Sequence, residues 1–290
     1  MQYLLWVVLT SFLRRTPPAV AYAFATFCGR FAFACMPRLR QTTLRNYRHV
    51  LPSASPGLRR TVARQSVENY CHYLVDFARM DGRATHLEYR AGDAFERLRC
   101  ITRQRGAVIV PMHFGNWDAG AAAAIREGFA LTVVGDLFGD PRLDRAVFGA
   151  RERLGLRVLP SNQLGPSLLR PLRERGLLAL LLDKPSPGTG VPVPFFGQCV
   201  EVPGGPARIA LATGAAIVPV AFPRVARGHP AIRVLADFSI ETTPTGDREA
   251  DIRRITAAVM AAHERFIRAY PEQWYMFREM WPPGAHEGHR

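Results

Sequence analysis

Lysine is almost absent from this chain of 290 residues. Only Lys184 is a lysine; the other 37 of the 38 basic residues are arginines, and they outnumber 24 acidic residues to give a formal net charge of +14. A surface of this charge attracts polyanions, either nucleic acid or an anionic bilayer. The sequence has no RNA-recognition, zinc-finger or helix-turn-helix pattern. We therefore expect a membrane surface as partner and no nucleic acid.

Metal-binding and disulfide patterns are also missing. The five cysteines are scattered, form no C-x-x-C pair, and suit a reducing compartment. Apart from the histidine discussed below, the histidines form no H-x-H or H-x-x-x-H set: His49, His72, His86, His229, His263, His286 and His289. We expect no metal site.

No apolar run reaches the roughly 20 uninterrupted residues that span a bilayer. Residues 1–13 and 19–35 are apolar and aromatic-rich but shorter, and the arginines follow the first run. A cleaved signal peptide has its positive charge before the apolar run. Two interpretations remain, short helices at the membrane interface or ordinary buried helices. We favour the interface and expect 1–37 to associate with a membrane.

The rest of the chain has the pattern of a helix-covered sheet. Residues 38–80 predict helices, with Ser55-Pro56 as cap and first helical position. Beyond residue 100, short apolar runs at 107–111, 130–135, 177–182, 216–222 and 232–238 alternate with helical segments. This alternation predicts an α/β fold. We expect one domain over 38–290, with its α/β core at about 100–240. A C-terminal helix and tail follow at 246–290, with the helix itself near 247–270.

The segment "PMHFGNWDAG" (111–120) carries the chemistry. His113 follows a predicted buried strand, and Asp118 falls in the first turn of the next helix. Gly115 and Asn116 suit a tight turn between them. Such a turn would bring the Asp118 carboxylate to the imidazole, fix its tautomer and make His113 a general base. A structural histidine beside a helix-start aspartate is the alternative.

An enzyme nucleophile is absent from this pattern. There is no G-x-S-x-G elbow, and Cys100 precedes the strand instead of following it. A base without a nucleophile must activate something from outside, either water or a substrate hydroxyl.

"HFGNWD" (113–118) resembles the H-x4-D/E motif of the glycerolipid acyltransferase superfamily. Its form is similar to that of bacterial lipid A biosynthesis acyltransferases, the lauroyl and myristoyl transferases, and of phosphatidylinositol mannoside acyltransferases. Further blocks resemble the family in the same order: "LLDKPSPGTGVPVPFFGQ" (181–198), "PGGPARIALATGAAIVPV" (203–220) and "PEQWYMFREMWP" (271–282).

The resemblance implies a glycerolipid-acyltransferase-like sheet flanked by helices, with His113 as general base and Asp118 orienting it. A lipid or sugar hydroxyl would attack the thioester of acyl-CoA or acyl carrier protein, which acts as co-substrate with no other cofactor. Backbone N–H groups around Gly115, Asn116 and Trp117 would hold the oxyanion.

Four further residues become substrate-binding candidates. Asp183 matches a family block from which Lys184 and Pro185 depart, and Asp136 matches an acidic position of the mannoside-type relatives. Arg151 matches their arginine, although a solvated helix face explains it equally well. Arg208 begins a Gly/Pro-led helix and could hold phosphate.

These observations predict an O-acyltransferase, peripheral or monotopic, on the cytoplasmic face of the inner membrane. Its acceptor would be a glycolipid or phospholipid: a lipid A precursor, a mannosylated phosphoinositide or another glycolipid. The alternatives are a thioesterase-like hydrolase, in which His113 activates water, and a non-catalytic protein that binds anionic membranes.

Overall fold

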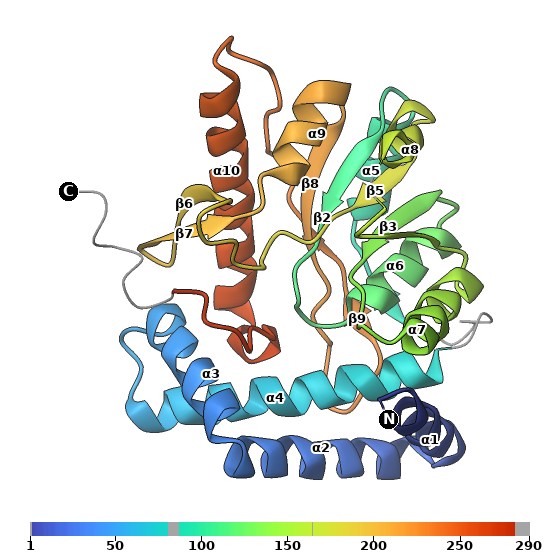
Figure 1. Cartoon of the computed structure of the whole chain (residues 1–290), viewed down its shortest axis with the longest axis vertical. Helices are drawn as coiled ribbons and strands as arrows, with labels where there is room; N and C mark the ends of the chain where they lie inside the picture. The colour runs from blue at the N-terminus through green and yellow to red at the C-terminus, as the bar shows by residue number, and fades with distance from the viewer. Residues whose placement is uncertain (1, 81–86, 164, 282–290) are drawn as a thin grey trace.

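A six-stranded sheet forms the centre of the computed structural model, which describes residues 2–80, 87–163 and 165–281 (Figure 1). Its strands lie in the order β10–β8–β2–β5–β3–β4, and only β10 runs antiparallel to its neighbour. The fold is therefore mixed α/β, as predicted, and its sheet is mainly parallel. The strands are β2 (Ala107–Val110), β3 (Leu131–Gly135), β4 (Arg157–Pro160), β5 (Leu177–Ala179), β8 (Ala216–Ala221) and β10 (Leu235–Ala236).

Helices cover both faces of the sheet because its central strands are apolar on both sides. From β2, Val108 and Val110 pack toward α9 (Gly205–Thr213) and α10 (Arg248–Ala269). The alternate residue Ile109 packs toward α5 (Ala94–Thr102) and α6 (Trp117–Arg126). The part of the chain after residue 87 also contains the helices α7 (Pro141–Arg153), α8 (Arg170–Arg173), η1 (Pro166–Leu168) and η2 (Pro271–Gln273).

Several elements differ from the sequence prediction. The run 232–238 is two short strands: β9 (Ile232–Arg233) pairs with β1 (Tyr89–Arg90), and β10 pairs with β8. Strand β4 and the hairpin of β6 (Val191–Phe195) and β7 (Gln198–Val202) were not predicted. The end of the predicted tail, 282–290, lies outside the described residues.

Four helices precede the sheet: α1 (Gln2–Arg15), α2 (Pro18–Cys35), α3 (Pro37–Val50) and α4 (Pro56–Arg79). Ser55 caps α4 as predicted, since its hydroxyl accepts from the Leu58 N–H. Helix α4 lies across the carboxyl end of the sheet, and α2 lies along the other side of α4 (Figure 1).

Helices α1 and α2 expose large apolar side chains to solvent. Leu5, Val8, Phe27 and Phe31 are each at least 60% exposed. Among the described residues, α2 is the one helix long and apolar enough to cross a bilayer, and 28% of its 18 residues are buried. The sequence prediction held that neither apolar run was long enough to span a bilayer, but α2 is. The length of α2 therefore does not decide whether this helix spans a membrane or lies at its interface.

Gly29 sets the distance between α2 and α4, because a Cβ there would fall 2.7 Å from the Cα of Glu68. Gly57, in α4, has nothing within 4 Å of the same position. Alanine favours both helices, but overpacking typically costs about 1–3 kcal/mol. We expect Gly29→Ala to be less stable than Gly57→Ala by about that amount in chemical denaturation. Equal stabilities would show that α2 and α4 are not closely packed.

Candidate active site

A sharp turn follows β2 and carries His113. Gly115 has φ +60°, and a Cβ on it would fall 2.0 Å from the carbonyl oxygen of Phe222, so a side chain cannot fit. Asn116 caps α6 by accepting from the Ala119 N–H at 2.9 Å, and its amide donates to Asp76 at 2.7 Å. Gly115 and Asn116 therefore shape the turn from inside the protein.

The partner of His113 is Asp183, which lies 70 residues further along the chain. The carboxylate accepts from the backbone N–H of His113 at 2.9 Å and lies 2.9 Å from its ring Nδ1. The indole of Trp274 donates to the same carboxylate at 3.3 Å. With Nδ1–H facing Asp183, the lone pair of Nε2 is the free base of the ring. The His113 side chain is 38% exposed, whereas that of Asp183 is 1% exposed.

Burial and charge act in opposite directions on this pair. Burial lowers the pKa of His113, but Asp183 and, more weakly, Asp136 outweigh it, so the pKa is raised above its ordinary value. Burial raises the pKa of Asp183, but the His113 ring and N–H outweigh this effect and lower it. The site therefore holds an ionised carboxylate against an imidazole of raised basicity.

Within the described residues Asp118 makes no hydrogen bond to His113, whereas the prediction brought its carboxylate to the imidazole. Its carboxylate accepts from the Arg151 guanidinium at 2.8 and 3.2 Å and from the Tyr73 hydroxyl at 2.7 Å. Asp118 belongs to α6, past the turn, while Asp183 follows β5, the strand directly beside β2. Neighbouring parallel strands end at the same edge, so the distant carboxylate comes closer to the imidazole than the local one.

The Asp118–Arg151 pair supports an aromatic platform next to His113. The rings of Tyr73 and Trp117 stack with centroids 4.0 Å apart. The Trp117 ring in turn meets His113 edge to face at 5.5 Å. Arg151 is thus an internal ion-pair partner, with 15% of its side chain exposed, and not part of a solvated helix face.

Of the other predicted residues, Asp136 lies at the site and Arg208 does not. Asp136 follows β3, is exposed, and lies 3.3 Å from the Lys184 ammonium. Arg208 pairs at 3.0 Å with Glu249, in the first turn of α10, whereas Trp274 follows the opposite end of that helix. The helix start that suggested a phosphate site therefore lies away from His113.

The backbone N–H groups expected to hold an oxyanion are partly used by the fold. Gly115 donates to the carbonyl of Gln273, and Asn116 donates to that of Phe222, both at 2.9 Å. These bonds fix the turn against β8 and the segment after α10. Gly115 and Asn116 therefore cannot supply those donors without opening the turn.

An apolar cavity opens beside the platform, between the sheet and helices α5 and α6. The empty space along this cavity amounts to about 840 Å³, with the open solvent at its mouth included. Trp117, Asp118 and Arg151 line it together with small residues of α6, Gly120, Ala121 and Ala124. The alanine-rich sequence of α6 leaves this space unfilled.

Tyr73, Trp274, Lys184 and Arg278 are site residues that sequence reasoning did not single out. Arg278 lies close enough for its charge to lower the pKa of His113. Trp274 and Arg278 belong to the block "PEQWYMFREMWP", and Lys184 to "LLDKPSPG", so the family blocks were the available signal. Tyr73 had none beyond its place in the predicted helical segment 38–80.

Comparison with known proteins identifies the family of the chain. Residues 1–282 match the family model of the bacterial lipid A biosynthesis acyltransferases. The chain is similar to the phosphatidylinositol mannoside acyltransferase of Mycobacterium tuberculosis (strain H37Rv), with 27% identity over 279 residues, 94% of this chain and 85% of that protein. It is 32% identical over 184 residues to the enzyme of the same name from Mycolicibacterium smegmatis, covering 61% of this chain and 57% of that protein. The protein is an acyltransferase, and it belongs to the bacterial lipid A biosynthesis acyltransferase family.

Proposed function

We propose that this enzyme moves a fatty acyl chain from an acyl thioester, acyl-CoA or acyl carrier protein, to a hydroxyl of a glycolipid or phospholipid. The observation that carries the proposal is the pairing of His113 with Asp183 beside an apolar cavity. The similar mycobacterial enzymes, by name, act on phosphatidylinositol mannosides, which favours a glycolipid acceptor. We also propose that the sheet and its flanking helices have the fold of the glycerolipid acyltransferases.

The chemistry follows from the free Nε2 of His113. This nitrogen takes the proton of the acceptor hydroxyl, and the oxygen forms a bond to the thioester carbonyl carbon. When the tetrahedral intermediate collapses, the C–S bond breaks and the departing sulfur takes the proton back from His113. Asp183 stabilises the imidazolium between these two steps. For the oxyanion we propose the Trp117 N–H and the positive end of α6.

Asp118 keeps a role in this proposal as a positioning residue. Its contacts with Tyr73 and Arg151 hold Trp117 beside the imidazole. Asp136 and Lys184, exposed at the same edge of the sheet, are placed to contact the polar part of a substrate. The non-catalytic alternative is inconsistent with membership of an acyltransferase family.

The cavity is proposed as the site of the acyl chain. Its lining is apolar apart from Asp118 and Arg151. The exposed apolar faces of α1 and α2 would hold the enzyme at the cytoplasmic face of the inner membrane. In this scheme residues 1–37 dock on the bilayer, and 38–290 form the catalytic domain.

Replacing His113 tests the proposed function directly. We expect His113→Ala to lower acyl transfer from a labelled acyl thioester to a lipid extract by about 10²–10⁴-fold, because the general base is lost. His229→Ala is the control, since His229 lies in the loop after β8 and contacts neither Asp183 nor Trp117. Wild-type transfer by a folded His113→Ala protein would contradict the mechanism. Release of the acyl group to water by the wild type, without transfer, would identify a thioesterase.

The role of Asp183 predicts a change in pH dependence. His113 acts as a base only when neutral, so kcat/KM falls as pH drops through its raised pKa, above about 6.5. We expect Asp183→Asn to move this acid limb to lower pH, because the raising charge is gone, and to reduce the maximal rate by up to about 10⁴-fold. Asp136→Asn should move the limb in the same direction by a smaller amount. An acid limb that stays in place in Asp183→Asn would show that another group titrates.

Narrowing the cavity should change the acyl-chain preference. We expect Ala121→Leu to favour shorter acyl thioesters, since each CH2 that no longer fits loses about 0.8 kcal/mol, roughly fourfold in kcat/KM. The control is Ala212→Leu on the exposed side of α9. Kinetics over a series of chain lengths measures the effect, and an unchanged profile would place the acyl chain elsewhere.

A further inference from the structure

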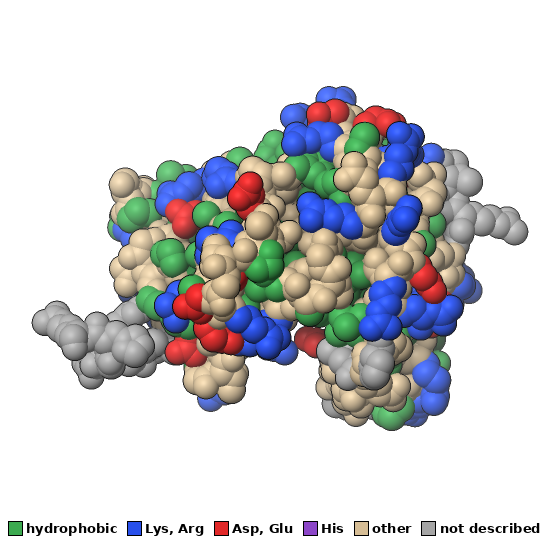
Figure 2. All heavy atoms as spheres, turned by 90° about the horizontal axis from the view of Figure 1, so that it is seen from above, with side chains coloured by type: hydrophobic (Ala, Val, Ile, Leu, Met, Phe, Trp, Pro, Cys, Tyr) green, Lys and Arg blue, Asp and Glu red, His purple; other side chains and the backbone are tan. Residues whose placement is uncertain are grey.

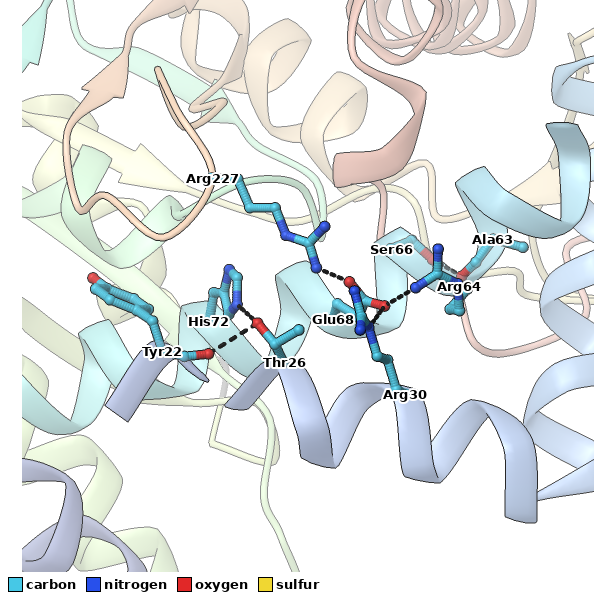
Figure 3. A network of polar contacts seen from close by, with 9 residues as sticks. All are labelled: Tyr22, Thr26, Arg30, Ala63, Arg64, Ser66, Glu68, His72 and Arg227. Atoms are coloured by element: carbon cyan, nitrogen blue, oxygen red, sulfur yellow. Dashed lines mark hydrogen bonds and ion pairs between the residues drawn. The ribbon is translucent and has the colours of Figure 1, made fainter. Parts of the chain in front are cut away.

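Three arginines from separate segments converge on one buried carboxylate, that of Glu68 in α4. Arg30 of α2 donates to it at 3.1 Å and Arg64 of α4 at 2.5 Å. Arg227, in the segment after β8, forms a third ion pair with the other carboxylate oxygen. Figure 3 shows the three guanidinium groups surrounding Glu68. We call these four residues the arginine cluster.

The arginine cluster holds more positive charge than the buried carboxylate needs. Glu68 is fully buried, and one well-placed arginine would pair with it. Three guanidinium groups around it leave two positive charges in excess. Partial burial, followed by the charges of Arg30 and Arg64, lowers the pKa of Arg227. The arginines therefore repel one another, and an anion bound between them would relieve that repulsion.

The guanidinium groups retain donors that face solvent. Within the described residues, each arginine gives one hydrogen bond, to Glu68, out of the five N–H groups it carries. Their side chains are 57%, 32% and 42% exposed for Arg30, Arg64 and Arg227. Glu68 thus fixes the orientation of three guanidinium groups that keep further N–H donors for a ligand. Planar forks of this kind suit phosphate oxygens.

The arginine cluster lies at the edge of an apolar stripe. Phe27 and Phe31, next to Arg30 on α2, stack on each other and are 63% and 60% exposed. An anionic phospholipid has the complementary arrangement, with apolar acyl chains next to a negatively charged headgroup. The neighbour of Glu68, Asn69, donates to the carbonyl of Glu272, in the segment that pairs with Gly115. A lipid bound here would therefore be fixed relative to the turn that carries His113.

We propose that Arg30, Arg64 and Arg227, held by Glu68, form a binding site for the phosphodiester of an anionic bilayer phospholipid, distinct from the acceptor at His113. The site would set the orientation of the enzyme on the membrane. It rests on the membrane association in the proposed function, and it adds a specific headgroup contact to the general attraction expected of a net positive charge.

Vesicle flotation of the full chain tests the site. The vesicles are phosphatidylcholine alone, or mixed with phosphatidylglycerol or, at equal surface charge, with the carboxylate lipid cholesteryl hemisuccinate. We expect the wild type to prefer phosphatidylglycerol over the carboxylate lipid. Arg30→Gln with Arg227→Gln should weaken binding to phosphatidylglycerol vesicles by about 30-fold, which corresponds to ~2 kcal/mol for two arginines near an anionic surface.

Two further variants separate a specific site from the charge of Lys and Arg side chains elsewhere on the surface, which are scattered over the face shown in Figure 2. Arg170→Gln with Arg265→Gln removes two exposed arginines that each pair with one carboxylate elsewhere, and should weaken binding less than about threefold. Arg30→Lys with Arg227→Lys keeps the charge but not the forks, and should lose the preference for phosphate over carboxylate. Thermal unfolding checks that the variants are folded.

The proposal would be overturned if the two double glutamine variants lost equal amounts of binding to phosphatidylglycerol vesicles. Equal binding of the wild type to phosphatidylglycerol and to cholesteryl hemisuccinate vesicles would also overturn it. Vesicle binding needs no turnover, so this outcome is separate from that of the acyl-transfer assay. We expect Arg30→Gln with Arg227→Gln to retain transfer between detergent-dispersed substrates. A wild type that shows the phosphate preference without acyl transfer would refute the proposed function and leave the lipid site intact.

Discussion

The contact between His113 and Asp183 depends on one constraint, the parallel alignment of β2 with β5. Residues 107–109 of β2 pair in register with 177–179 of β5. Both strands then end at the same edge of the sheet, and the residues that follow them meet there. The distance of 2.9 Å between Nδ1 and the carboxylate is a consequence of that register. Shifting either strand by one residue would separate the two side chains.

Helix α4 connects several other elements to this edge of the sheet through buried polar contacts. Its Tyr73 reaches Asp118, and its Asp76 accepts from Tyr22 of α2, from Asn116 and from Arg224. Polar groups buried this deeply are stable only when all of them are paired. Helices α1 and α2, the turn after β2 and the segment after β8 are therefore held by a single helix. Helix α2, which exposes apolar side chains, is thereby connected through α4 to the turn that carries His113.

The family and the geometry constrain different parts of the chemistry. Family membership identifies an acyltransferase, and the similar mycobacterial enzymes favour a glycolipid acceptor. The geometry concerns the proton: it leaves Nε2 of His113 free and gives the buried carboxylate to Nδ1. It also distinguishes the contacts of two carboxylates, since Asp183 contacts the imidazole and Asp118 contacts Arg151.

The sequence by itself determined the α/β class, the strand before His113, the capped helix after Asn116 and the family. These depend on local periodicity, on turn chemistry and on short blocks that resemble a known family. It also marked His113, Asp136 and Asp183 as functional candidates. Only the tertiary structure decided that Asp183 and not Asp118 is the partner of His113, that Arg208 lies away from the site, and that three arginines surround Glu68. Each of these depends on which strands and helices become neighbours, and side chains tens to hundreds of residues apart meet only after the sheet has formed.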